Sequence, residues 1–376
     1  MSDTSLAPIR APKVTMARTG LIGAALIVIG LVALFAGARF GLMLAIGLGF
    51  GVALEGLRFG FAGPWRAMIL RREPAGILAQ FLAIALVACV AIPLLTAHPE
   101  ELSGAQAPIG WAMIGGAFVF GAAMQVVLGC GSGTLVNAGS GNPVGLLALP
   151  FFAIGSFAGA YHLIWWTGLG ALPILTLRGI PGLAVTLAGL ALLAGLFWAL
   201  GKPGSRRVPT RYLVAALVLA ALAIANLVVA GQPWGVVYGL GLWAAKGAVA
   251  LGADLSGSAF WAASGSVERL RSSVLTDYTS LTDFGLIAGA FGVAAWRRGG
   301  LAQPLPSYPA RAWVATVIAG LLLGYSSRLA FGCNVGAFFS GIATGSLHGW
   351  VWFVAAFAGA FVGIRLRPLV GLEART

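Results

Sequence analysis

Long apolar segments separated by short polar ones run along the whole sequence. Several approach the roughly 20 residues that a helix needs to cross about 30 Å of hydrocarbon. Backbone groups in lipid have to be hydrogen-bonded within the segment, so each apolar window is predicted to be a helix. The windows are residues 21–35, 76–95, 144–163, 182–200, 213–230, 312–323 and 350–362.

The complete pattern predicts an all-α polytopic membrane protein with about 9–11 transmembrane or re-entrant helices. Segments 41–57 and 234–251 are glycine-rich and interrupted by charge, which favours re-entrant or broken helices there. Basic residues precede the first apolar window, as in a secretory signal. However, that window is too long and lacks a small-residue cleavage site, so we expect a first transmembrane helix instead.

Composition agrees with a lipid-embedded chain, since 59% of residues are hydrophobic and 9% are charged. Such a sequence cannot supply an ordinary soluble surface. The net charge of +13 would suggest nucleic-acid binding in a soluble protein. Here the basic residues lie between apolar windows, and neither a zinc-finger spacing nor a basic and aromatic stripe is present. Nucleic acid is therefore not an expected partner.

The basic clusters predict the orientation of the chain in a bacterial-type inner membrane. Loops rich in Lys and Arg stay in the cytoplasm, whereas the acidic connection 98–101 is expected outside. Both termini are then cytoplasmic. The predicted organisation is a tail at 1–19, a first membrane repeat at 20–200, a cytoplasmic linker at 201–211, a second membrane repeat at 212–364 and a tail at 365–376.

A spaced glycine and cysteine pattern recurs between the two halves. The helix leading to the first cysteine starts outside and the helix leading to the second starts inside, so the predicted repeats are inverted. Inverted repeats with broken helices commonly build one central transport site. Gly121, Gly129, Cys130 and Gly133 recur 203 positions later as Gly324, Gly332, Cys333 and Gly336, and Gly155 and Gly159 align with Gly359 and Gly363 after a slip of one residue.

Both cysteine segments interrupt an apolar helix with glycine. Glycine permits positive φ and close backbone approach, so successive N–H groups can point into one concavity that suits an anion. A half-helix starting at each segment would add partial positive charge from its N-terminus. The expected substrate-binding residues are Gln125, Gly129, Cys130, Gly131, Ser132 and Gly133 in the first segment and Arg328, Gly332, Cys333, Asn334 and Gly336 in the second.

Several roles are open for the cysteines. Cys130 and Cys333 could be buried packing residues, could meet a soft sulfur atom through S–H hydrogen bonds or as thiolates, or could form a disulfide. A disulfide needs Cα atoms within about 7 Å, which the sequence does not reveal. Cys89, in an apolar window, is expected to be a small buried hydrophobe.

Charged residues in apolar surroundings are functional candidates because a buried charge needs a partner or a cavity. Arg328 either attracts the substrate anion or pairs with an acid such as Asp277 or Asp283, which are themselves secondary candidates. Lys246 either binds substrate or pairs with Asp254. His348 is either an interfacial hydrogen-bonding residue or a proton relay.

Other chemistry is not indicated by the sequence. His98 and His162 have no third ligand in reach by spacing, so no metal site is predicted. Glu55 and Arg58 have the spacing of an i,i+3 pair. A Walker loop, a G-x-S-x-G elbow and an H-E-x-x-H motif are all missing, which argues against ATP-driven pumping and against these enzyme classes. No cofactor is expected.

The two cysteine segments resemble those of the YeeE/YedE family of sulfur-compound transporters, which includes thiosulfate importers. The most specific likeness is 328–341, continuing through 345–350 to 366–368. The stretches 129–134, 233–235 and 279–285 also look familial, so the resemblance covers most of the chain after Gly41.

The resemblance implies an hourglass-shaped helical fold, with loops dipping to a central constriction and thiol roles for Cys130 and Cys333. The family often has a further cysteine in an Arg-Phe-Cys-Phe segment, whereas this chain has Gly60 in that place. The resemblance also implies a small cytoplasmic sulfur-carrier protein of the TusA kind as a partner.

The sequence therefore predicts uptake of a small sulfur-containing anion, with thiosulfate first, by a transporter rather than an enzyme. Alternatives are a selenium species or another sulfur compound as substrate. A membrane enzyme that transfers sulfur through a cysteine persulfide, and a scaffold whose cysteines only pack, are different classes of function.

Overall fold

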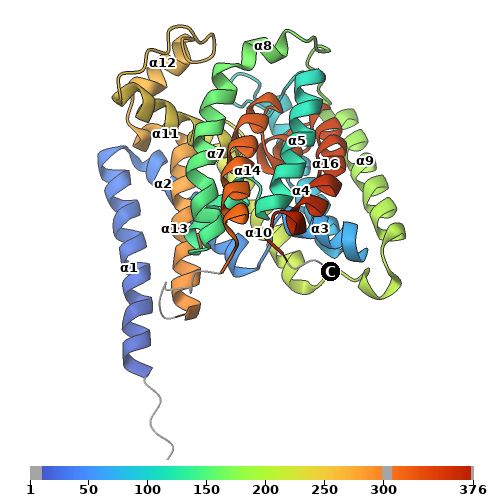
Figure 1. The fold of residues 1–376 in the computed structure, drawn as a ribbon, viewed down its shortest axis with the longest axis horizontal. Coiled ribbons are helices and arrows are strands. Elements are labelled where there is room, and N and C mark those ends of the chain that lie inside the picture. The colour runs from blue at the N-terminus through green and yellow to red at the C-terminus, as the bar shows by residue number, and fades with distance from the viewer. Residues whose placement is uncertain (1–10, 299–306, 374–376) are drawn as a thin grey trace, which may run out of the picture.

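The apolar windows predicted as helices all form helices in the computed structural model, which describes residues 11–298 and 307–373 (Figure 1). Within these ranges the only β-type pairings are two isolated bridges, Gly110 with Ala171 and Thr176 with Ser346. The elements in chain order are α1 (Ala11–Phe35), α2 (Ala38–Gly56), α3 (Ala62–Arg71), α4 (Ala75–Ala97), α5 (Trp111–Val127), α6 (Gly131–Gly139), α7 (Pro143–Tyr161), α8 (Leu163–Thr167), α9 (Gly179–Leu200), η1 (Pro203–Ser205), α10 (Thr210–Ala230), α11 (Val237–Ala250), α12 (Ser264–Arg271), η2 (Val274–Thr276), α13 (Tyr278–Arg298), α14 (Ala310–Leu329), η3 (Asn334–Phe339), α15 (Ser340–Ala343) and α16 (His348–Leu369).

Nine segments of the described chain are long and apolar enough to cross a membrane. The protein is thus an all-helical, multi-pass membrane protein, as predicted. The segments are Arg18–Phe35, Ala38–Gly56, Ala75–Ala97, Trp111–Gly139, Pro143–Tyr161, Gly179–Leu200, Thr210–Ala230, Ala310–Ala343 and His348–Leu369.

The prediction of a broken helix at 41–57 is wrong, because α2 runs without interruption from Ala38 to Gly56. Its glycines are contact points rather than breaks. A Cβ atom placed on Gly47 would lie 2.4 Å from the carbonyl oxygen of Thr282 on α13. The segment 234–251 does contain a shorter helix, α11, which begins at Val237 after a non-helical stretch.

Glycine-mediated contact dominates the packing of the long helices. A Cβ on Gly121 of α5 would lie 1.9 Å from the Ala356 carbonyl oxygen of α16, and one on Gly359 would lie 1.9 Å from that of Phe118. A Cβ on Gly155 of α7 would lie 2.2 Å from the carbonyl oxygen of Leu321 on α14. Small residues let membrane helices approach closely enough for backbone packing. Six of the recurring glycines are therefore contact points of the helix pairs: Gly121, Gly155, Gly159, Gly324, Gly359 and Gly363.

The most extensive contacts join a helix from before the 201–211 linker to one from after it. The three main pairs are α2 with α13, α7 with α14 and α5 with α16. Contact positions advance together along both partners, as in Gly47 with Thr282 and Gly51 with Leu286, so each pair runs parallel. Helix α4 makes less extensive contacts, with α9 and with α10.

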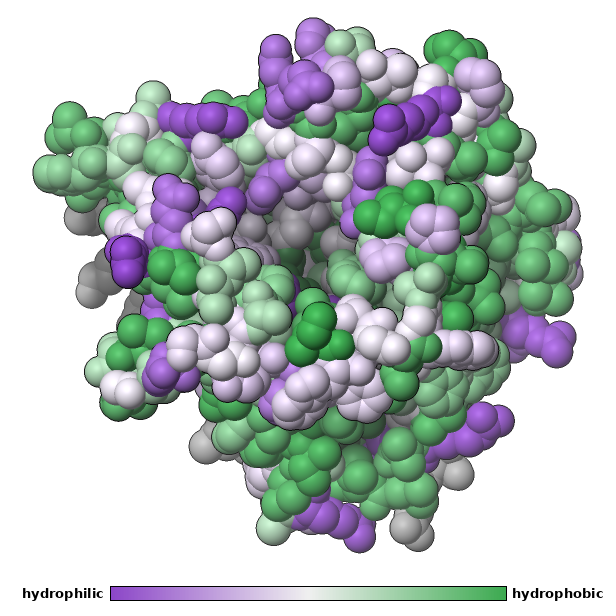
Figure 2. Space-filling model, turned by 90° about the horizontal axis from the view of Figure 1, so that it is seen from above, coloured by the Kyte–Doolittle hydropathy of each residue, from purple (hydrophilic) through white to green (hydrophobic). Residues whose placement is uncertain are grey.

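Hydrophobic residues make up much of the perimeter when the molecule is seen from above (Figure 2). Large apolar side chains such as Leu34, Leu192 and Val354 are more than half exposed, as expected of a lipid-facing surface. Cys89 on α4 is exposed as well, which corrects the expectation that it is buried. Its apolar helix has no polar face that could have shown which side points outward.

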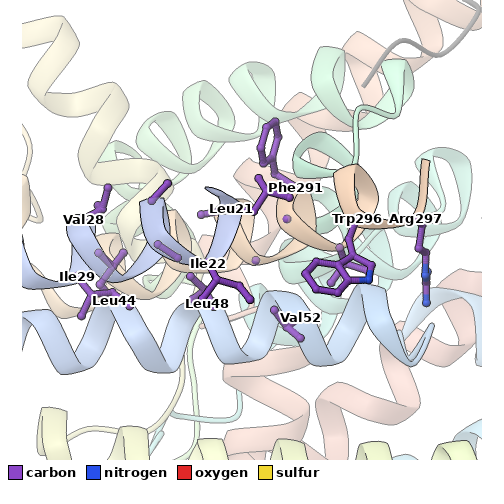
Figure 3. A pocket seen from close by; sticks show the side chains of 16 residues that line it. Leu21, Ile22, Val28, Ile29, Leu44, Leu48, Val52, Phe291, Trp296 and Arg297 are labelled. Atoms are coloured by element: carbon purple, nitrogen blue, oxygen red, sulfur yellow. The ribbon is translucent and has the colours of Figure 1, made fainter. Parts of the chain in front are cut away.

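Helix α1 lies at the edge of the molecule and packs mainly on α2 (Figure 1). It leaves a recess of about 560 Å³ against α2 and α13, lined by apolar side chains such as Ile22, Leu48 and Phe291 and ending at Trp296 and Arg297 (Figure 3). This apolar lining suits hydrocarbon and offers almost nothing to an anion.

Candidate functional site

The two cysteine segments adopt the same backbone conformation. Leu128 and Phe331, each two residues before a cysteine, have left-handed φ values of 53° and 56°. Such values are uncommon for residues other than glycine and mark a constrained turn. Each segment ends one helix and begins another, so Cys130 is the N-cap of α6 and Cys333 that of η3.

Backbone hydrogen bonds repeat the same geometry in both segments. Gly129 N–H donates to the carbonyl of Met124 at 3.1 Å, and Gly332 N–H donates to that of Ser327 at 2.8 Å. The carbonyls of Cys130 and Cys333 accept from the N–H four residues later, both at 2.8 Å. The glycine before each thiol lies close to the turn that follows it. A Cβ on Gly332 would lie 2.7 Å from the backbone nitrogen of Ala337.

The Cys130 thiol is buried at the N-terminus of α6. Its sulfur accepts a hydrogen bond from Gly133 N–H at 3.4 Å and lies 3.4 Å from the hydroxyl of Ser132. The Thr134 hydroxyl donates to the Cys130 carbonyl at 2.8 Å, which fixes the first turn. The thiol therefore sits where helix N–H groups create positive potential.

The Cys333 thiol packs directly against the first cysteine segment. Its sulfur lies 2.8 Å from where a Cβ on Gly131 would be, and Cys333 has no exposed surface. The two cysteines are both free, so no disulfide joins them. Segments that are far apart in the sequence thus form one buried centre with two thiols.

Beside this centre, Asn334 is fully buried, and neither its amide nitrogen nor its amide oxygen has a hydrogen-bond partner. A Cβ on Gly336, two residues further on, would meet nothing within 4 Å. Buried amides are normally satisfied, so these atoms are available to a bound molecule.

A polar cavity of about 680 Å³ reaches the Cys130 segment from the side that carries Arg71 and the 201–211 linker. Cys130, Ser132 and Gly133 lie in its wall, together with Arg58, Arg71, Arg211, Glu55 and Glu73. We call this cavity the vestibule.

The sequence reasoning missed the vestibule, because it used the arginines only to assign orientation. Arg71 is paired with Glu73 at 2.9 Å, which lowers the pKa of that carboxyl. Arg58 has a φ of 51°, and in the described chain no carboxylate pairs with it. The predicted Glu55–Arg58 pair does not form, since Glu55 pairs with Arg297 at 3.4 Å. The sequence did hold one indication of the vestibule: the charged residues Glu55 and Arg58 stand directly before the aromatic and glycine segment 59–61, and all of these residues line the cavity.

Arg328 lies in the last turn of α14, five residues before Cys333, and it does not line the vestibule. Its guanidinium stacks on Phe260 at 4.6 Å and faces Tyr238 at 5.7 Å. Its Nε is buried and has no hydrogen-bond partner. The alternative of an ion pair with Asp277 is not realised, because Asp277 pairs with Arg269 at 2.6 Å.

Gln125, at the position equivalent to Arg328, has a different environment. It is fully buried, and its amide nitrogen donates to the Ala62 carbonyl at 3.0 Å while its amide oxygen has no partner. It therefore anchors the start of α3 beside the vestibule.

The secondary candidates are spread over the molecule. Lys246 donates to the carbonyls of Leu270, at 2.8 Å, and Ser272, so its predicted pair with Asp254 does not form. Asp254 instead accepts from Ser256 N–H and its hydroxyl, which lower the pKa of the carboxyl. Lys246 and Asp254 are thus each satisfied by hydrogen bonds to other groups and form no ion pair with one another.

His348 and Asp283 are buried. His348 Nδ1 lies 2.7 Å from the Ser346 hydroxyl, and its Nε2 has no partner. Asp283 has no exposed surface, and neither of its carboxyl oxygens has a hydrogen-bond partner. No grouping of three or more metal-ligating side chains occurs between residues 11 and 298 or 307 and 373.

The model of the family described as sulphur transport matches residues 57–362, which is more than half of the chain and includes both cysteine segments. The chain belongs to the sulphur transport family. The vestibule arginines 58, 71 and 211 also fall inside the matched range, whereas α1 lies before it.

Two named bacterial proteins are similar to this chain. The thiosulfate transporter TsuA of Spirochaeta thermophila is 26% identical over 336 residues, which are 82% of this chain and 93% of TsuA. The probable transporter YedE of Escherichia coli is 35% identical over 100 residues, which are 27% of this chain but only 24% of YedE. The likeness to TsuA thus extends over nearly the whole of both proteins, and that to YedE over about a quarter of each.

Proposed function

We propose that this protein takes up a small sulfur-containing anion, most readily thiosulfate, along a path that passes Cys333 and Cys130. The observation that carries the proposal is the contact of the Cys333 sulfur with Gly131, which unites the two thiols at one buried centre. The similarity to a protein named a thiosulfate transporter over 82% of the chain supports the choice of substrate.

The charges along the proposed path favour an anion. Arg328, five residues before Cys333, supplies a cation without an ion pair, and Arg58 and Arg211 supply cations in the vestibule. The N-terminus of α6 and the free amide of Asn334 add donors at the centre. S–H groups are weak donors, so they can hold a polarisable sulfur atom without trapping it.

The proposed architecture is a pair of inverted repeats. It is supported by the way helices pair. We take α5 as equivalent to α14, α7 to α16, α2 to α10 and α4 to α13. Exchange of the equivalents then turns the α5–α16 contact into α14–α7 and the α2–α13 contact into α10–α4, and all four contacts are present. The common conformation of the two cysteine segments agrees with this exchange.

The proposed location is a bacterial inner membrane, with both termini and the vestibule on the cytoplasmic side, because the clusters of Arg and Lys lie there. A TusA-like sulfur carrier would then receive the anion or its sulfur near the vestibule. Co-purification of such a carrier with the wild-type protein, but not with a variant lacking Arg58 and Arg211, would test that partnership.

The decisive experiment is uptake of radiolabelled thiosulfate by cells that lack their own importers. Wild type is compared with Cys130→Ala and Cys333→Ala at matched membrane expression, and Cys89→Ala on the lipid-facing surface is the matched control. We expect wild type and the Cys89 variant to transport and the other two to fail. Transport by both site variants would disprove the thiol path.

A second measurement separates transport from covalent sulfur transfer. Mass spectrometry of the purified protein after exposure to thiosulfate should show unmodified Cys130 and Cys333 if the thiols only form hydrogen bonds. A persulfide on either one would assign the protein to sulfur transfer instead.

A further inference from the structure

Asp283 is a buried carboxyl group that the proposed anion path does not use. It has no exposed surface, and both of its oxygens lack a hydrogen-bond donor. Burying an ionised carboxylate without a partner is strongly unfavourable, whereas a neutral carboxyl tolerates such a site. The surroundings therefore suit a proton on this side chain.

Asp283 lies between α13 and α11, close to the thiol centre. A Cβ on Gly239 of α11 would lie 2.7 Å from one carboxyl oxygen, so the carboxyl rests against bare backbone. Val236 precedes Gly239 by three residues, and its Cγ1 atom is 3.4 Å from where a Cβ on Gly131 would be. One turn of α11 thus separates the carboxyl from the segment on which the Cys333 sulfur packs.

Among the described residues, none of the charged side chains on the neighbouring elements forms an ion pair with Asp283. On the elements beside Asp283, Asp277 pairs with Arg269, and Lys246 binds the carbonyls of Leu270 and Ser272. On α14, Arg328 stacks on Phe260 and Tyr238.

The helices on the other sides offer no counter-charge either. On α2, Arg39 stacks on Tyr278 and Glu55 pairs with Arg297, while α6 has no charged residue. Nothing described around Asp283 would stabilise its ionised form permanently.

Uptake of an anion such as thiosulfate faces an electrical barrier. An inside-negative membrane potential opposes the entry of negative charge, and each charge adds to the opposition. Movement of a proton with the anion removes part of that barrier. A carboxyl that is neutral when buried, and that lies next to the anion path, is the kind of group that proton-coupled transporters use.

We propose that Asp283 is a proton-binding site that couples passage of the anion to the proton gradient, an inference that rests on the proposed function. In each cycle an O–H bond forms on the carboxyl with a proton from outside. That bond breaks with release of the proton to the cytoplasm. No electrons are transferred, and no bond to the substrate forms.

The test uses the purified full-length protein in liposomes that contain no other transporter. The initial rate of labelled thiosulfate uptake is measured with an inward proton gradient and without one. We expect the gradient to accelerate wild type several-fold, and the two rates to become equal in Asp283→Asn, which mimics the protonated form permanently. Asp254→Asn, which changes an exposed carboxyl that binds only Ser256, should keep the wild-type acceleration. An unchanged response in Asp283→Asn, or no response in wild type, would overturn the proposal.

A measurement without transport keeps this proposal separate from the proposed function. Infrared difference spectroscopy at neutral pH should show the carbonyl stretch of a protonated carboxyl in wild type and in Asp254→Asn, and that band should be absent in Asp283→Asn. If wild type takes up no thiosulfate but shows this band, the substrate assignment fails while the proton site stands. If wild type lacks the band, Asp283 is ionised and the proton site is refuted, whatever the protein transports.

Discussion

The sulfur of Cys333 lies 2.8 Å from the position that a Cβ on Gly131 would occupy, so the second thiol fills the space left by a missing side chain next to the first. The contact explains why glycine follows Cys130. Any side chain there would displace Cys333 from the centre.

We predict that Gly131→Ala lowers thiosulfate uptake by about tenfold, because overpacking a buried contact typically costs roughly 1–3 kcal/mol and shifts the neighbouring group. Uptake at matched expression measures the effect. Gly235→Ala is the control, since a Cβ there would meet nothing within 4 Å. Equal uptake by both variants would show that the position of the Cys333 thiol does not matter.

Arg328→Gln should lower uptake by roughly tenfold, since it removes an unpaired buried cation and a charged hydrogen bond is commonly worth about 1.5–3 kcal/mol. The substitution gives position 328 the residue type that the first cysteine segment has at the equivalent position, Gln125. Arg271→Gln, on the exposed end of α12, is the matched loss of charge. The expected defect is in the concentration dependence of uptake. If Arg328→Gln behaves like Arg271→Gln, the anion does not meet Arg328.

Cys130 should react with a membrane-impermeant maleimide from one side only, because it lies in the wall of the vestibule. In a Cys89→Ser background we expect slow labelling of Cys130 in inside-out vesicles and none in right-side-out vesicles. Cys333, which is fully buried and does not line the vestibule, should stay unlabelled in both. Labelling from the opposite side would reverse the predicted orientation.

The stability of the fold should depend on glycine at the helix contacts. Gly121→Ala is expected to lower the thermal midpoint in detergent by several degrees, because the new Cβ would lie 1.9 Å from the Ala356 carbonyl oxygen and overpacking costs roughly 1–3 kcal/mol. Gly115→Ala on the same helix, where a Cβ meets nothing within 4 Å, should be neutral or slightly stabilising. A similar drop in both would point to loss of helix flexibility instead.

The long helices and the two cysteine segments could be predicted because lipid imposes strong rules on a sequence. Apolar length identifies the helices, and the recurrence of Gly121 as Gly324 and of Cys130 as Cys333 identifies equivalent places. The same rules misled at α2, where Gly47 and Gly51 serve helix contact and not a break. Glycine has both uses, and only the presence of a partner helix decides between them.

The partners of the charged side chains could not be read from the sequence. Glu55 finds Arg297 rather than Arg58, and Asp277 finds Arg269 rather than Arg328. The vestibule is likewise assembled from the α2–α3 loop, the α5–α6 segment and the start of α10. Such a cavity exists only after the helices have packed, so local charge patterns indicated the arginines without indicating what they surround.

The pairing of early helices with late ones also constrains how the protein is made. While α5 and α7 enter the membrane, their partners α16 and α14 have not yet been translated. Their glycine faces must meanwhile contact lipid or the insertion machinery, neither of which matches a neighbouring backbone. Assembly is thus expected to finish only after α16 has been inserted. A ribosome that stops in the 201–211 linker would leave an incomplete bundle for membrane proteases to remove.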